Sequence, residues 1–278
     1  MILRKLTPAD RAQAEALWHE IFAEDTRAFN TYYFDNRFYP AHSFGAFDGD
    51  RLAAMALGRP TEIAAEGRIL PALLVAGVST RPPYRGQGLM HRLMTLLIDH
   101  ARSGGFACCY LHPVSETLYA SLGFRNGTDA LVIRSDAARA HGAFELKEGT
   151  DISDLLAVYG AVLGTHDGMQ LRDAHEMQLV LADYAADGAE TLIACADGRP
   201  VGYICFAEDG LVSELTALSA DAYAFLLDEA AKRTGRELTA IVPTDCGLTG
   251  ERRYSMQYLV FGNAFKLPLQ NGFCRLAY

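Results

Sequence analysis

The chain of 278 residues is 50% hydrophobic and 21% charged, a balance typical of folded globular proteins, and its length predicts two domains. Its formal net charge of -9 argues against nucleic acid as a partner, because phosphate binding needs clustered Lys and Arg, and it suits a small cationic molecule. The six cysteines lack C-x-x-C spacing and no apolar run is long enough for a signal peptide or a membrane span, so we expect a cytoplasmic protein without disulfides, a zinc site or a membrane partner.

The first half of the chain, to about residue 135, alternates helical and strand patterns, which predicts an α/β fold. Thr7, Pro8 and Asp10 supply a capping signal for the first helix, whereas residues 24–40 are aromatic and irregular. Gly77 interrupts a buried strand, as a residue at a β-bulge does. The expected strands cover residues 2–6, 43–47, 52–58, 61–65, 73–80, 107–112 and 131–134. The expected helices cover residues 8–23, 90–101 and 116–122.

The second half repeats this order of elements in a weaker form, which predicts a duplication at the level of the fold. Residues 135–142 are small and polar, so we expect one domain over residues 1–138 and another over 139–278, each a mixed twisted sheet flanked by helices. The expected strands cover residues 144–147, 191–196, 200–207, 211–218 and 237–242, with further strands in the tail 254–278. The expected helices lie within residues 152–185 and over 220–234.

A glycine-rich turn over residues 85–88 joins a buried strand to the clearest helix of the chain. Glycines lack Cβ atoms and let a ligand approach the main chain, while the start of a helix adds unpaired N–H groups and the positive end of its dipole. Arg85 adds a charged donor, so we expect an anion here, and a pyrophosphate fits best. The turn lacks both the Lys-Ser/Thr pair of nucleotide-triphosphate loops and G-x-G-x-x-G spacing, which argues against ATP and dinucleotides.

The turn resembles the R/Q-x-x-G-x-G/A hallmark of the GNAT superfamily of N-acetyltransferases, with Met90 in place of the small last residue. The run from Tyr119 to Phe124 resembles the Y-x-x-x-G-F motif of the same family. The resemblance implies that Tyr119 protonates the thiolate leaving group, that the strand around Gly77 splays from its neighbour to admit pantetheine, and that direct transfer needs no metal. It also implies that acetyl-coenzyme A contacts the following residues: Val78, Arg85, Gly86, Gln87, Gly88, Leu89 and Met90.

Residues 71–94 and the run Ser-Glu-x-x-Tyr at 115–119 are similar to the Eis-type tandem acetyltransferases, although the chain is too short for the third, sterol-carrier-like domain of that group. The similarity implies a second domain without a cofactor turn, because residues 218–221 read Leu-Ser-Ala-Asp at the corresponding place. In that group the terminal carboxylate acts as the base, which implies this role for Tyr278. His112, acting through water, is an alternative base.

The acceptor pocket of the family lies near the first helix and the loop after it, which implies that aromatic walls and carboxylates surround a cationic amine. The candidate residues are Trp18, Glu24, Asp25 and Tyr33, with Tyr32 and Phe34 beside them. We expect an aminoglycoside-like or polyamine-like acceptor. Amines of proteins or peptides remain open as acceptors, as does a coenzyme A sensor without catalysis, and the second domain is also a candidate scaffold for a homo-oligomer.

Overall fold

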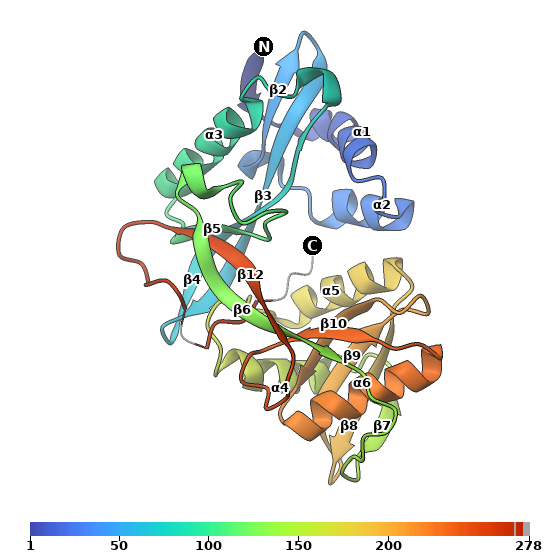
Figure 1. Ribbon diagram of the computed structural model, residues 1–278. Coiled ribbons are helices and arrows are strands. Elements are labelled where there is room, and N and C mark those ends of the chain that lie inside the picture. Colours follow the sequence, from blue (N-terminus) through green and yellow to red (C-terminus); the bar gives the residue numbers. More distant parts are fainter. Residues whose placement is uncertain (270, 275–278) are drawn as a thin grey trace.

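The elements of the protein occur in the same order twice, as seen in a computed structural model that describes residues 1–269 and 271–274 (Figure 1). The first series is β1 (Ile2–Lys5), α1 (Arg11–Ile21), α2 (Arg27–Asn36), β2 (Phe44–Asp48), β3 (Arg51–Ala65), β4 (Arg68–Thr80), α3 (Leu89–Ser103), β5 (Cys108–Leu111) and β6 (Arg125–Arg134). The second is β7 (Glu145–Glu148), α4 (Ile152–Leu163), α5 (Ala174–Ala186), β8 (Glu190–Ala196), β9 (Arg199–Phe206), β10 (Val212–Ala217), α6 (Ala220–Thr234), β11 (Thr239–Val242) and β12 (Glu251–Val260). Short 3₁₀ turns lie at Pro8–Asp10, Pro40–His42, Pro82–Tyr84 and Ala120–Leu122. This order agrees with the duplication expected from the sequence.

The strands form two sheets, and the larger one contains strands from both halves of the chain. Its order is β1-β2-β3-β4-β5-β12-β6-β11, with β4 and β5 parallel and the other neighbours antiparallel, whereas the smaller sheet is antiparallel with the order β10-β9-β8-β7. β12 lies between β5 and β6, and β6 pairs with β11 along its other edge, so both long strands cross between the upper and lower units in Figure 1. The larger sheet therefore crosses residue 138, and the division into domains at that residue stays a prediction.

The α/β fold class is confirmed, and the elements differ from expectation in five places. The helix expected over residues 116–122 is only a 3₁₀ turn at Ala120–Leu122, which ends at Gly123 with a φ angle of 90°. The strand expected over residues 131–134 is the last part of the longer strand β6. Residues 24–40 are not irregular, because they contain α2, whose first turn is capped by Thr26 Oγ1 accepting from the N–H of Phe29 at 3.0 Å. The run of aromatic residues hides the helical pattern, in which Phe29, Tyr33 and Phe34 face the core.

The other two differences concern strand lengths. The strands expected over 52–58 and 61–65 form the single strand β3, because Pro60 lies beyond the residues that pair with β2, on an edge where proline is tolerated. Of the strands expected in the tail, the described residues contain only β12. Beyond it, Gly262, Pro268 and Gly272 interrupt the chain, and the segment packs irregularly through Phe265 and Leu269.

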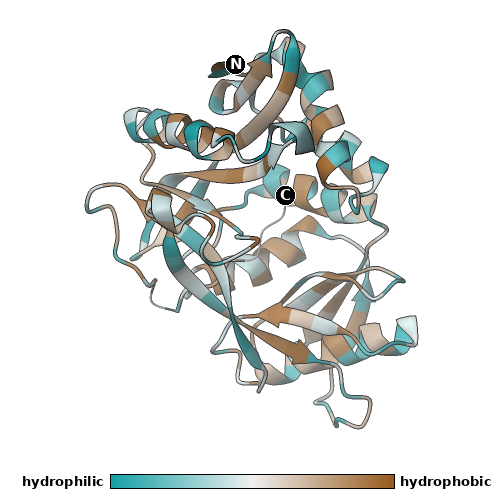
Figure 2. Cartoon of the chain, turned by 45° about the horizontal axis from the view of Figure 1, so that its top comes forward, coloured by the Kyte–Doolittle hydropathy of each residue, from teal (hydrophilic) through white to brown (hydrophobic). Residues whose placement is uncertain are grey.

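Helices pack on both faces of each sheet. In the smaller sheet α6 lies on one face, and α4 and α5 lie on the other. α3 packs against β2, β3, β4 and β5 through its apolar stripe, which comprises Leu93, Met94, Leu97, Ile98 and Ala101. α1 and α2 pack on the opposite face with Leu57 and Met55 of β3. Figure 2 shows hydrophobic residues concentrated along the strands and mixed polarity along the helices. No helix in the described part of the chain is both long and apolar enough to cross a membrane.

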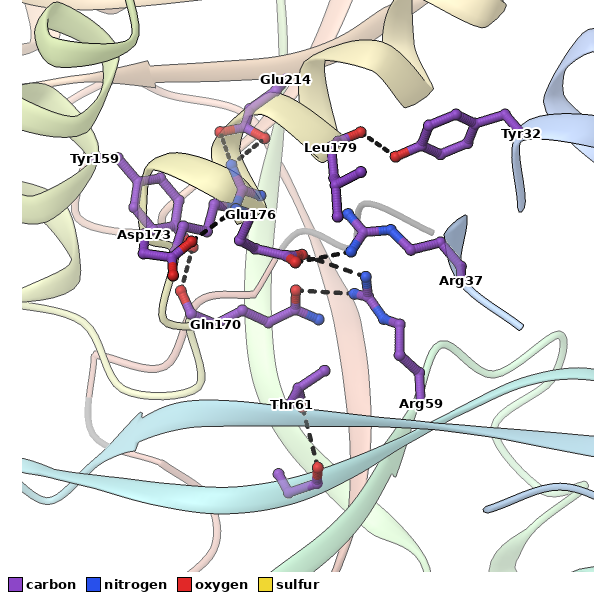
Figure 3. Close-up of polar contacts among 12 residues, drawn as sticks. Tyr32, Arg37, Arg59, Thr61, Tyr159, Gln170, Asp173, Glu176, Leu179 and Glu214 are labelled. Carbon is purple, nitrogen blue, oxygen red and sulfur yellow. Dashed lines mark hydrogen bonds and ion pairs between the residues drawn. The ribbon is translucent and has the colours of Figure 1, made fainter. Parts of the chain in front are cut away.

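A salt-bridge network joins α2 and β3 of the first half to the second half (Figure 3). Glu176 of α5 accepts from Arg37 Nη1 at 2.7 Å and lies 3.4 Å from Arg59 Nη1. Arg59 Nη2 also donates to Gln170 Oε1 at 3.1 Å, and Tyr32 of α2 donates to the carbonyl of Leu179. Because both arginines are about 98% or more buried at the side chain, these contacts fix α2 against α5.

A second buried ion pair lies within the second half. Arg172 Nη1 is 2.9 Å from both carboxylate oxygens of Glu214, which also accepts hydrogen bonds from Tyr184 and Tyr203. The guanidinium lies 4.2 Å from the ring centroid of Tyr159. Burial alone would raise the pKa of Glu214, but Arg172 and the two hydroxyls outweigh it and hold that pKa below its ordinary value.

We expect Arg172→Met to lower the free energy of unfolding by about 3–5 kcal/mol, because it leaves the carboxylate of Glu214 buried without a counter-charge. Urea denaturation measures the change. The difference in unfolding free energy between wild type and variant should shrink at pH values below the pKa that the glutamate has in the unfolded chain. As the pH falls further through the lowered pKa of folded Glu214, the wild type also loses the stability that the ionised carboxylate contributes. The double variant Arg172→Met, Glu214→Leu should recover part of the lost stability, because it also removes the buried charge. If the single and the double variant are equally destabilised, the unpaired carboxylate of Glu214 is not the cause of the loss.

Candidate active site

The turn before α3 is open and carries no side-chain cap. Gly86 and Gly88 adopt φ angles of 75° and 69°, in the left-handed region that favours glycine, and Gly88 is the N-cap residue of α3 without any side-chain hydrogen bond. A Cβ atom at either glycine would meet no atom within 4 Å. The start of α3 is therefore uncovered at these glycines and lacks a side-chain cap, and its first N–H groups lie at the positive end of the helix dipole, which suits an anion.

The residues predicted to bind the cofactor lie in and around this turn. Arg85, Gly86, Gln87 and Gly88 are exposed, and Arg85 Nε donates to the carbonyl of Thr80 at 3.1 Å, which holds the guanidinium group at the turn. Leu89 is 3% exposed and Met90 is half-buried, and both pack on the core under α3, so they offer a ligand mainly their backbone N–H groups.

The corresponding turn of the second half is closed. Ser219 Oγ caps α6 by accepting from the N–H of Ala222 at 3.2 Å, and Asp221 adds a negative charge to the first turn. A capping side chain and a carboxylate both disfavour an anionic ligand at this position.

β4 and β5 separate near their carboxyl ends, as the family resemblance implies. Residues 72–74 of β4 pair with residues 108–110 of β5, but β4 continues to Thr80 without this partner. Between the pairs Leu57–Ala76 and Met55–Ser79, β4 has one residue more than β3. This bulge contains Gly77 at a φ angle of 55°, which confirms the bulge predicted from the sequence.

A cavity of about 210 Å³ lies at the opening between the two strands. Five residues predicted to be functional line it together: Trp18, Asp25, Val78, His112 and Tyr119. The complete lining is Trp18, Phe22, Asp25, Phe29, Val75, Ala76, Gly77, Val78, Leu111, His112, Val114 and Tyr119. The first helix, the bulged strand and the loop after β5 thus converge on one small space.

Tyr119 lies at the start of a 3₁₀ turn and is 5% exposed. Its ring packs beside Phe124, with the ring centroids 5.9 Å apart. Burial raises the pKa of its phenol, so the hydroxyl keeps its proton at neutral pH and can donate it.

Trp18 and Asp25 form a pair on the opposite wall. Trp18 Nε1 donates to Asp25 Oδ2 at 2.7 Å. The indole ring covers the bulge so closely that a Cβ atom on Gly77 would lie 2.4 Å from Trp18 Cζ3. Glycine is thus required at residue 77 both for the φ angle and for the position of this ring.

The other residues predicted from the sequence lie elsewhere. Glu24 is exposed and does not line the cavity, because the chain turns between it and Asp25. Tyr33 is 2% exposed and lies behind Trp18, with the ring centroids 4.5 Å apart, so it supports the wall of the cavity without reaching its interior. Tyr278 lies outside the described residues, and its role as a base stays a prediction.

A larger cavity of about 980 Å³ adjoins the first and shares His112 and Val114 with it. Its further lining is Pro113, Ser115, Glu116, Asp129, Ala130, Val132, Ile241, Arg252, Arg253, Tyr254 and Ser255. Arg252 Nε donates to Asp129 Oδ2 at 2.7 Å, and Tyr254 is 54% exposed. Sequence reasoning missed this site because β11 and β12, far along the chain, supply five of its thirteen lining residues and carry no local motif.

Comparisons with known proteins were made for the family and for the fold. Residues 3–127 match the acetyltransferase (GNAT) domain. Similar solved structures include a probable N-acyltransferase from Enterococcus faecalis (TM-score 0.73, 17% identity, 93% of this chain and 72% of that chain) and Eis1 from Mycobacterium abscessus (0.70, 16%, 94% and 74%). A putative acetyltransferase from Pyrococcus horikoshii covers 99% of this chain and 95% of its own, with a TM-score of 0.61 and 16% identity. At such identities the likeness establishes the fold, and no curated protein matches the sequence.

We expect Gly77→Ala to destabilise the protein more than Gly49→Ala does. Both glycines have positive φ angles, which costs alanine about 1–2 kcal/mol, but a Cβ atom at Gly49 meets no atom within 4 Å. Displacement of Trp18 should cost Gly77→Ala about 1–3 kcal/mol more, seen in urea denaturation together with a shifted emission of Trp18. Equal losses in the two variants would contradict the tight packing of Trp18 on the bulge.

Proposed function

We infer that this chain, an N-acetyltransferase with a GNAT domain over residues 3–127, transfers the acetyl group of acetyl-coenzyme A directly to a primary amine of a small molecule. The observation that carries the proposal is the cavity at the β4–β5 opening, which joins a bulged strand, a neutral phenol and a carboxylate. Acetylation of an amine panel by purified protein tests the function. If the protein acetylates none of the amines in the panel, the proposed function is wrong.

The turn at residues 85–88 fits the pyrophosphate of coenzyme A. Its glycines leave the space above the turn open, and its N-cap residue leaves the first N–H groups of α3 available. Arg85 would add a charged donor, while Gly86, Gln87, Gly88, Leu89 and Met90 would contribute backbone N–H groups. The bound co-substrate supplies an activated acyl group as a thioester.

The residues around the cavity have separate proposed roles. Backbone N–H groups of residues 75–78, on the edge of β4 that lacks β5, would bind the pantetheine arm and polarise the thioester oxygen. Tyr119, neutral because of its burial, would donate its proton to the departing sulfur. The apolar walls around it, such as Leu111 and Val75, would keep water away from the reacting atoms.

The larger cavity supports a small-molecule acceptor. Its volume of about 980 Å³ lies at the upper end of the range typical of small-molecule sites. Arg252 and Arg253 also line it, but they are paired with Asp129 and Glu251. Together with Asp25 of the adjoining cavity, the carboxylate of Glu116 favours a cationic acceptor such as an aminoglycoside-like or polyamine-like amine.

The proposal also assigns different roles to the two halves, as in the Eis-type proteins: the first half binds the cofactor, and the second half helps to hold the acceptor. The capped start of α6 supports a second half without cofactor, and the residues that β11 and β12 give to the larger cavity support a role in holding the acceptor.

We expect Tyr119→Phe to lower kcat by about 10²–10⁴-fold, because the thiolate then leaves without a proton donor. The KM for acetyl-coenzyme A should change little, as the ring still fills its place beside Phe124. Tyr39→Phe, at a half-buried tyrosine outside the cavity, is the matched control. An unchanged kcat of Tyr119→Phe across the amine panel would exclude Tyr119 as the acid.

Arg85→Ala should raise the KM for acetyl-coenzyme A by about tenfold or more, since it removes a charge-assisted hydrogen bond to the pyrophosphate. The kcat at saturation should stay near that of the wild type, because Arg85 does not line the cavity of Tyr119. Arg102→Ala, at the other end of α3, controls for a general loss of positive charge. If Arg85→Ala and Arg102→Ala have the same KM for acetyl-coenzyme A, Arg85 does not bind the pyrophosphate.

A further inference from the structure

The loop that carries Asp25 is short and held at both ends. The N–H of Asp25 donates to the carbonyl of Phe22 at 3.2 Å, which closes a turn directly after α1. The next residue, Thr26, caps α2 and donates through Oγ1 to Asp187 Oδ1 of the second half at 2.9 Å. Asp25 therefore has a fixed backbone position between two packed helices.

The side chain of Asp25 is oriented by a single hydrogen bond. Trp18 is 4% exposed and is enclosed by aromatic rings, so the direction of its indole N–H is set by packing. This N–H donates to Oδ2 of Asp25, and no other donor to this carboxylate is seen among residues 1–269 and 271–274. The carboxylate is half-buried and lines the cavity, so its second oxygen is available to a ligand there.

The charges around Asp25 keep it a useful base. Burial raises the pKa of its carboxyl, the bond from Trp18 opposes this, and the negative charges of Glu24 and Asp187 raise the pKa further. Glu24 belongs to the same loop, Asp187 follows α5, and His112 and Tyr119 face Asp25 from the other walls of the cavity. A carboxylate with a raised pKa is a stronger base and accepts a proton more readily than an ordinary aspartate does.

We propose that Asp25, oriented by Trp18, binds the ammonium group of the acceptor and is the general base that removes its proton; this rests on the function proposed above. The nitrogen then attacks the thioester carbon, the N–C bond forms and the C–S bond breaks. Tyr119 gives its proton to the sulfur. Two protons leave the nitrogen in all: Asp25 accepts the first and releases it to water, and the second replaces, through solvent, the proton lost by Tyr119.

Asp25→Asn tests this assignment. We expect kcat/KM for the amine to fall by at least about 100-fold and its decline on the acid side of the pH profile to disappear, because the group that must be ionised is gone. Binding of coenzyme A, measured by calorimetry, should not change. Glu15→Gln, on α1 and outside the cavity, should keep the wild-type profile. If Asp25→Asn keeps both rate and profile, or if only His112→Gln removes the acid limb, the proposal is wrong.

A second measurement needs no turnover. Trp18 is the only tryptophan of the chain, so its fluorescence should titrate with the protonation of Asp25, above the ordinary pKa of an aspartate, and Asp25→Asn should abolish this transition. Asp187→Asn should lower the apparent pKa in both the fluorescence and the rate profile, because it removes a negative charge that faces Asp25. A fluorescence transition that is identical in Asp25→Asn overturns the proposal. Wild-type protein that acetylates no amine refutes the proposed function instead.

Discussion

The separation of β4 from β5 is the constraint on which the site depends. Parallel strands normally bond along their full length, and backbone N–H groups left without partners inside a protein are costly unless water or a ligand satisfies them. Here the pairing stops after residue 74 of β4, and the bulge at Gly77 turns the rest of the strand. A ligand with amide groups along an extended chain, such as a pantetheine arm, can form hydrogen bonds with the open edge of β4 in place of a strand.

The second half holds this opening in place from both sides. β12 pairs with β5 and fixes one side of it, while Glu176 of α5 binds Arg37 and Arg59 and fixes α2 on the other. The loop between α1 and α2, which carries Asp25, is thereby held against the second half as well, through Thr26 and Asp187. In the function proposed above, both repeats therefore form the acceptor side of the site, whereas the glycine turn at residues 85–88 belongs to the first repeat alone.

Sequence patterns predicted the parts of the protein that depend on neighbours along the chain. The stripe of α3, the glycine turn before it and the bulge at Gly77 all follow from local rules of packing and φ angle, and the structure agrees with each of them. The pairing of β12 with β5 could not be predicted, because nothing in residues 251–260 specifies a partner strand that ends at Leu111, far earlier in the chain. For the same reason the larger cavity, the buried pair of Arg172 and Glu214, and the position of Glu24 outside the site emerged only from the fold.

The function proposed above assigns the cofactor to the first repeat alone, although both repeats have the same order of elements. A cavity of about 520 Å³ in the second half lies between the ends of β10 and β11 at the start of α6, where the first half has its cofactor opening. Ser219 Oγ accepts from the N–H of Ala222, one of the donors that a phosphate would need, and Asp245, paired with His166 at 2.8 Å, adds negative charge to the wall. A capping serine where the first repeat has glycine, and acidic side chains where it has Arg85, both disfavour a pyrophosphate at the start of α6, while the helix itself is kept.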